Sequence, residues 1–161
     1  MDGYLLRAND IAAMKGTDKV HFLDAGAKRL NRSLGDATGL TGIGVHLIEV
    51  RPGDSTTAHH VHQHEDEGVY ILSGHATATI GDADFAVGPG DFIGYRKGGL
   101  AHSIHNSGTE TLRCLVVGER LAHDACDYPR LGRRLYRDAR LPARLVALDD
   151  PAPLPPTVGK K

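Results

Sequence analysis

Five of the ten histidines in this 161-residue chain fall between positions 46 and 64. The segment that follows a turn at Pro52-Gly53 contains His60-Val61-His62. Side chains two positions apart on a strand point to the same side, so His60 and His62 can present their imidazoles toward one point. Neutral imidazole binds Zn, Cu, Fe and Ni, and an added carboxylate extends the range toward Mn. The spacing therefore predicts a chelating pair for a divalent transition metal.

Two residues outside this pair are candidates to complete the site. Glu67 lies five residues after His62, beyond a polar bend, and can return as a carboxylate on the next strand. His102 opens a strand directly after the Gly98-Gly99 turn. We predict that His60, His62, Glu67 and His102 hold the metal.

Neighbouring polar residues offer alternatives. His64 continues the alternation and could replace Glu67 or another ligand, although a bend before Asp66 should take it off the strand. His59 and His105 lie at odd offsets from the ligands, so we expect them to face the other side. Glu65 and Asp66 are most simply a solvated acidic turn, but either could accept the second ring N–H of a ligand histidine.

The chain between 43 and 117 is built from short apolar or alternating segments bounded by Gly, Pro, Asn and Asp. The predicted strands cover 43–50, 69–72, 75–80, 83–87, 92–95, 101–105 and 112–117. Such short spacing leaves no room for the crossover helices that parallel strands require. The prediction is an all-β fold, with antiparallel strands in a small barrel or sandwich.

These residues resemble the two motifs of the cupins. The first motif matches at Gly53, His60, His62, Glu67 and Gly74, with one extra residue after Gly53. The second matches at Gly90, Gly98, His102 and Asn106, with Arg96 where the family has proline and one extra residue before the histidine. The resemblance implies a double-stranded β-helix, the cupin or jelly-roll barrel. It also implies one divalent metal held inside by three His and one Glu, and assembly as a homodimer.

Arg96 and Lys97 are the only Lys or Arg residues between 53 and 110, where eight Asp and Glu occur. In the cupin barrel that the resemblance implies, the turn that carries these two residues lies near the mouth of the cavity. Arg96 is therefore a candidate substrate-binding residue that could hold an anionic group through a bidentate contact. The alternative is an ordinary charged surface turn.

The flanks differ in composition from the central segment. We divide the chain into an N-terminal arm over 1–42, a barrel core over 43–118 and a C-terminal extension over 119–161. Residues 130–144 carry six Arg and one Asp, with Arg133 and Arg137 one helical turn apart, which favours a short helix. The Pro-rich end predicts an extended surface tail.

Composition excludes several classes of function. Nineteen Lys and Arg against twenty Asp and Glu leave no global positive field for nucleic acid or an acidic membrane surface. The sequence contains no run of eighteen apolar residues and no signal-peptide pattern, which predicts a cytoplasmic protein. Cys114 and Cys126 are too few for a disulfide scaffold, and Cys114 lies in an apolar run typical of the core.

The function predicted from these features is that of a metal-dependent cupin that acts on, or binds, a small polar and anionic molecule. The cofactor is one divalent transition metal per chain, drawn from Fe, Mn, Zn and Ni. Isomerase, lyase and dioxygenase chemistry all suit such a site, and no catalytic base is assigned. The alternatives are a binding or sensing module without turnover, and a metal that only stabilises the barrel.

Overall fold

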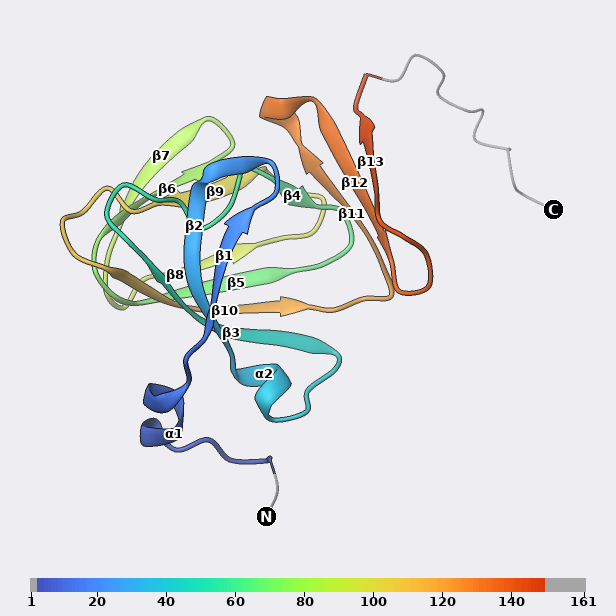
Figure 1. Cartoon of the computed structure of the whole chain (residues 1–161). Helices are drawn as coiled ribbons and strands as arrows, with labels where there is room; N and C mark the ends of the chain where they lie inside the picture. Colours follow the sequence, from blue (N-terminus) through green and yellow to red (C-terminus); the bar gives the residue numbers. More distant parts are fainter. Residues whose placement is uncertain (1–2, 150–161) are drawn as a thin grey trace.

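A computed structural model describes residues 3–149, and strands dominate it (Figure 1). The helices are α1 (Ala8–Ala13), α2 (Leu34–Ala37) and the 3-10 turn η1 (Pro129–Leu131). The first seven strands are β1 (Thr17–His21), β2 (Asp24–Ser33), β3 (Ile43–Val50), β4 (Val61–His62), β5 (Glu67–Ser73), β6 (Ala76–Ile80) and β7 (Ala83–Val87). The others are β8 (Phe92–Tyr95), β9 (His102–His105), β10 (Leu112–Glu119), β11 (His123–Tyr128), β12 (Arg133–Asp138) and β13 (Arg144–Ala147). The all-β prediction is confirmed.

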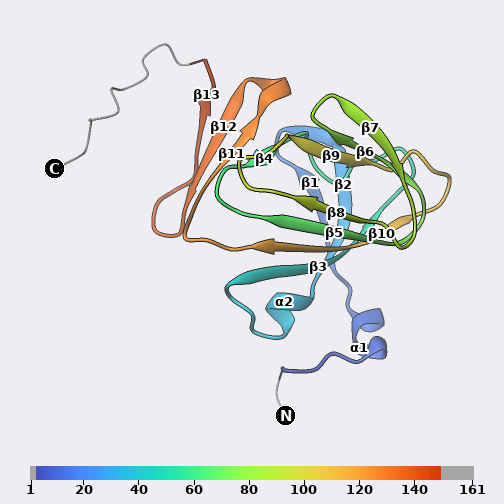
Figure 2. The same cartoon turned by 180° about the vertical axis from the view of Figure 1, so that it is seen from behind.

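Three sheets build the barrel and its flank. The largest has the order β1-β2-β3-β10-β5-β8, the second β7-β6-β9 and the third β13-β12-β11-β4, and neighbouring strands pair antiparallel. Figures 1 and 2 show the first two sheets closing around a common interior, with β11, β12 and β13 beside one end. The main core fills this interior and contains Ile48, Val50, Val69, Ile71, Ala76, Ala78, Ile93, Tyr95, Ile104, Leu112 and Cys114.

The tight turn between β5 and β6 depends on glycine. Gly74 has a φ of +85°, which side chains rarely adopt, and an added Cβ would lie 2.9 Å from the Leu112 Cα. This glycine lets β5 turn into β6 directly against β10. The turn therefore returns the chain to the barrel immediately after the strand that begins at Glu67.

The N-terminal arm joins the barrel instead of lying apart from it. Strand β2 pairs with β3, and β1 pairs with β2 as the edge of the largest sheet. On β2 the inward face carries Ala27, Arg29 and Asn31 at every second position, which follows strand periodicity. The arm therefore supplies side chains to the interior.

The helix predicted over 130–144 is wrong. That segment contains the end of the 3-10 turn η1, then β12, the loop after it and the start of β13, and β12 pairs with both β11 and β13. A spacing of four residues, as between Arg133 and Arg137, is even and so lies on one face of a strand as well as on one face of a helix. The predicted tail lies at 150–161, outside the described residues.

Among residues 3–149, no helix has the length and apolar character needed to cross a bilayer.

Candidate metal centre

His60 and His102 lie side by side because their backbones pair. The His60 N–H donates to the His102 carbonyl at 3.0 Å, and the His102 N–H donates to the His60 carbonyl at 2.7 Å. Both side chains are buried, at 5% and 3% exposure, and their ring centroids are 4.7 Å apart. The two motifs, about forty residues apart in sequence, therefore meet through one backbone bridge.

The ring orientation of both histidines is fixed by backbone carbonyls. His60 Nδ1 lies 2.9 Å from the Ala58 carbonyl oxygen, and His102 Nδ1 lies 3.3 Å from that of Leu100. A carbonyl only accepts, so each Nδ1 carries the proton and each Nε2 carries a lone pair. Burial is the main cause that lowers the pKa of His60 to about 3, so this ring is neutral at pH 7.

A buried carboxylate fixes the third imidazole. His62 Nδ1 donates to Asp124 Oδ2 at 2.6 Å, and the Asp124 side chain is 1% exposed. The other Asp124 oxygen accepts the His64 N–H at 3.1 Å. In a neutral His62 ring with its proton on Nδ1, Nε2 is also a lone-pair atom, and the histidine-carboxylate pair is the arrangement that commonly orients metal-binding histidines.

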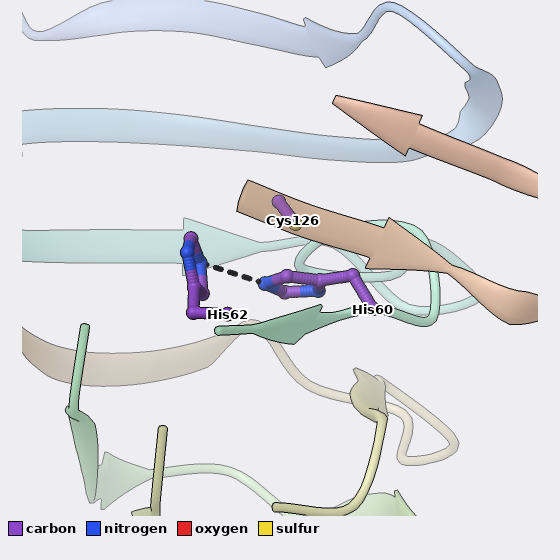
Figure 3. Close-up of side chains that lie close together, drawn as sticks. All are labelled: His60, His62 and Cys126. Atoms are coloured by element: carbon purple, nitrogen blue, oxygen red, sulfur yellow. Dashed lines mark hydrogen bonds between the residues drawn. The ribbon is translucent and has the colours of Figure 1, made fainter. Parts of the chain in front are cut away.

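The three lone pairs fit a shared cation. His60 Nε2 and His62 Nε2 lie 3.2 Å apart, within the hydrogen-bond distance that Figure 3 marks, but two neutral rings with the proton on Nδ1 have no proton to share there. His102 Nε2 is buried with no hydrogen-bond partner. Two nitrogens bound to one metal at roughly 2.1 Å each are separated by about 3 Å. A divalent metal would satisfy all three atoms.

Glu67 lies next to this cluster. Its Oε1 is 3.8 Å from His102 Nε2, too far for a hydrogen bond but suitable for sharing a cation. Burial raises the pKa of Glu67, but His102 and His60 outweigh this effect and hold the pKa below its ordinary value. Tyr95, which is opposite Glu67 on β8, stacks on His102 with ring centroids 3.5 Å apart. This stacking fixes the plane of the His102 ring.

Cys126 is an alternative ligand that the sequence did not suggest. It lies on β11 beside His60 and His62, as Figure 3 shows, and the ligand atoms of these three residues are within 4.8 Å of one another. A second set of this kind contains His62, Glu65 and Asp124, and neither set includes Glu67 or His102. Burial raises the pKa of the Cys126 thiol to about 12, which keeps it protonated at pH 7. The ligand set predicted from the sequence stays a prediction.

The acidic turn after His62 is not solvated at Glu65. This side chain is 7% exposed, accepts the Leu121 N–H at 2.7 Å and pairs with Arg137. Its Oε2 lies 3.7 Å from His62 Nδ1, so the carboxylates of Glu65 and Asp124 both lie next to the same ring nitrogen of His62. Asp66 is exposed and accepts the Lys97 N–H at 2.8 Å.

The remaining histidines of the motif region lie outside this cluster. His64 is exposed within the bend that follows β4, off the strand as predicted. His59 Nδ1 contacts the Ser103 hydroxyl at 3.3 Å, and His105 Nδ1 contacts the Ser55 hydroxyl at 3.2 Å.

A cavity of about 290 Å³ opens beside the imidazoles. Its wall includes side chains from β2, β3, β5, β8, β9, β11 and β12. Two arginines, Arg29 and Arg137, line it. Arg96 is exposed and does not line this cavity, so its role in substrate binding stays a prediction. Tyr95 and Tyr128 add aromatic surface, and burial raises the pKa of both hydroxyls.

Comparisons with known proteins agree with this geometry. Residues 46–118 match the family described as Cupin domain. A structure from Acidithiobacillus ferrooxidans, provisionally named a sugar phosphate isomerase, is 48% identical, with a TM-score of 0.92 over 95% of this chain and 97% of that one. The chain belongs to the cupin superfamily. No curated protein matches it.

Two further cupin structures are more distant. A sugar phosphate isomerase of the cupin superfamily from Silicibacter pomeroyi is 25% identical, with a TM-score of 0.78 over 91% of this chain and 96% of that one. A Thermotoga maritima protein named a predicted oxalate decarboxylase is 27% identical, with a TM-score of 0.52 over 58% of this chain and 82% of that one. The first two similarities extend through the arm and the C-terminal extension, whereas the third covers little more than half of this cupin.

Proposed function

We propose that this cupin is a metal-dependent isomerase of small phosphorylated sugars. The observation that carries the proposal is the set of three inward Nε2 atoms, on His60, His62 and His102, at the wall of one cavity. Similarity over nearly the whole chain to two proteins named sugar phosphate isomerases supports this reaction over lyase or dioxygenase chemistry.

The proposed ligands of one divalent transition metal are His60, His62, Glu67 and His102. When bound, such a metal supplies Lewis-acid polarisation of a carbonyl or hydroxyl oxygen. The protein itself holds His60 neutral and orients all three imidazoles through acceptors at their Nδ1 atoms. We also propose that the protein is a homodimer. Light scattering on the purified protein measures this oligomeric state.

Tyr95 is the proposed hydrogen-bond donor to a substrate oxygen. Its hydroxyl is buried, has no partner among the described residues, and belongs to a side chain that lines the cavity. Because burial raises the pKa of Tyr95, the hydroxyl keeps its proton at pH 7 and can donate it in a hydrogen bond. Isomerisation between an aldose and a ketose moves a proton between neighbouring carbons and changes which oxygen is the carbonyl. A fixed donor beside that oxygen would favour the reaction.

Proton NMR in D2O tests the activity. Metal-loaded protein is incubated with a panel of aldose and ketose phosphates, and we expect isomer formation together with solvent deuterium on the carbon next to the carbonyl. Binding without exchange for every member would replace the isomerase with a binding module. Substrate loss without an isomer would point to a lyase, and oxygen consumption to a dioxygenase.

The ligand set is tested by metal analysis of variants. His102→Gln should lose metal, whereas His105→Gln, on the same strand but exposed, should retain it. Cys126→Ser should also retain metal, because the thiol is not among the proposed ligands. Retention in His102→Gln combined with loss in Cys126→Ser would replace the proposed set with His60, His62 and Cys126.

A further inference from the structure

Arg29 is held in the cavity wall by the N-terminal arm. It lies on β2, and one guanidinium nitrogen, Nη1, donates to the Thr56 carbonyl. Its Nε is buried and has no hydrogen-bond partner among residues 3–149. An arginine N–H that is buried without an acceptor costs free energy unless a ligand or water supplies one.

The positive charge of Arg29 is not neutralised by an adjacent acid. Within the part of the chain that the structure describes, no carboxylate oxygen lies within 4.0 Å of its guanidinium. Burial lowers the pKa of Arg29, and the charge of Glu67 opposes this, so the group remains a cation at pH 7. Arg137, the other arginine of the wall, already pairs with Glu65. Arg29 is therefore a guanidinium of the cavity wall without a carboxylate within ion-pair distance among the described residues.

Further donors surround Arg29. Asn31, two residues along β2 on the same inward face, is 6% exposed, and its amide donates one N–H to His46 Nδ1 at 3.3 Å. His21 Nδ1 accepts the Leu23 N–H at 3.2 Å, so the proton of the neutral ring is on Nε2. Both side chains line the cavity. This part of the wall offers N–H groups, whereas the metal centre offers lone pairs.

We propose that Arg29, with Asn31 and His21 beside it, is the subsite that binds the phosphate group of the substrate. A guanidinium presents parallel N–H donors that match phosphate oxygens, and a phosphate monoester carries nearly two negative charges at pH 7. Phosphate at this subsite would place the sugar against the metal centre in the same cavity. The proposal rests on the proposed function for the identity of the substrate.

Calorimetric titration of metal-stripped protein tests the subsite, because phosphate then has no metal to bind. The probes are inorganic phosphate, a sugar phosphate that the wild type isomerises or binds, and the same sugar without its phosphate. Arg29→Gln should weaken binding of both phosphorylated probes by roughly 10- to 100-fold, the value of one charge-assisted hydrogen bond. Binding of the unphosphorylated sugar should not change.

Lys28→Gln is the matched control. Lys28 precedes Arg29 on β2, is exposed and does not line the cavity, so its replacement removes the same charge without changing the wall. Phosphate affinity in Lys28→Gln should be within about twofold of wild type, because exposed charges are screened. Equal weakening in both variants would show a general charge effect and overturn the proposal.

Further variants separate a binding role from a structural one. Arg29→Lys keeps the positive charge but loses the parallel N–H donors of the guanidinium. Its phosphate affinity should therefore lie between those of wild type and Arg29→Gln. Circular dichroism and metal content should match wild type in both Arg29 variants. If Arg29→Gln does not fold, Arg29→Lys with unchanged phosphate affinity would overturn the proposal.

The subsite and the isomerase can fail separately. Phosphate binding that depends on Arg29, without isomerisation of any sugar phosphate, would overturn the proposed function and leave the anion subsite supported. Isomerisation with unchanged KM and phosphate affinity in Arg29→Gln would leave the function and overturn the subsite. If wild-type protein binds neither phosphorylated probe, the subsite is wrong.

Discussion

Replacing Asp124 with asparagine should weaken binding of the proposed metal without unfolding the barrel. Both Asp124 oxygens accept N–H groups, one from His62 Nδ1 at 2.6 Å and one from the His64 backbone at 3.1 Å. An asparagine amide has one oxygen, so its NH2 must face one of these two donors whichever way it turns. If the NH2 faces His62, the ring proton moves to Nε2 and the metal loses that ligand.

The size of the effect follows from burial and geometry. The His62–Asp124 hydrogen bond is short, involves a carboxylate and is shielded from solvent, so its net value is about 1.5 to 3 kcal/mol. Loss of a carboxylate that supports a metal-binding histidine typically weakens metal affinity about 10- to 100-fold, equivalent to roughly 1.4 to 2.7 kcal/mol. We expect Zn²⁺ affinity to fall within this range.

Competition with a fluorescent chelator measures Zn²⁺ affinity for the wild type and Asp124→Asn, with circular dichroism as the test of folding. Asp138→Asn is the control, because Asp138 also contacts a histidine, His123, at 2.6 Å, but that histidine side chain is 72% exposed. The control should bind Zn²⁺ like wild type. Wild-type affinity in folded Asp124→Asn, or an equal loss in Asp138→Asn, would refute the assigned role of Asp124.

Three further outcomes follow from burial. Tyr95→Phe should leave stability unchanged or raise it by about 1 kcal/mol in chemical denaturation, because the unpartnered hydroxyl is removed while the ring still stacks on its neighbour, yet isomerisation should slow. Burial raises the pKa of Cys114 and Cys126 to about 12, so iodoacetamide at pH 8 should label neither thiol in the native protein and both in guanidinium, by mass spectrometry. Burial, with the charge of a nearby arginine, lowers the pKa of His21 and His46 below 6.5, so between pH 7.5 and 5.5 the unfolded chain takes up more protons. The free energy of unfolding of metal-stripped protein should therefore decrease as the pH is lowered from 7.5 to 5.5. A free energy that does not change with pH would contradict these burial effects.

The barrel was predictable because its signals are local. Strands over 43–50, 83–87 and 92–95 were predicted with the bounds that the structure has, since each ends at a Gly, Pro or Asp turn. Cys114 in the core was predicted from the apolar run around it, and it is fully buried. Alternation and turn residues determine which side chains face inward, and these features can be read without knowing the partner strand.

The support of the site was not predictable in this way. Asp124 is 62 residues from His62, and nothing in its local sequence distinguishes a carboxylate that will be buried behind a histidine from a solvated one. Arg29 belongs to a strand with weak alternation, and its role depends on the absence of a neighbouring acid, which is a tertiary property. Arg96 was singled out because positive charge is sparse between 53 and 110, but the distribution of charge along a chain does not determine which arginine a cavity will enclose.

Both segments that flank the barrel core contribute side chains to the candidate site, although a division into arm, barrel and extension suggests that the core alone forms it. The family match covers 46–118 and contains all four proposed metal ligands, but Asp124 lies after it and Arg29 before it. The barrel alone would bring the imidazoles together without the carboxylate that fixes one of them or the guanidinium that lines the same cavity. Under the proposed function, the shared segment supplies the metal ligands, and the flanking segments supply Asp124, which orients one ligand, and Arg29, which would bind the anion.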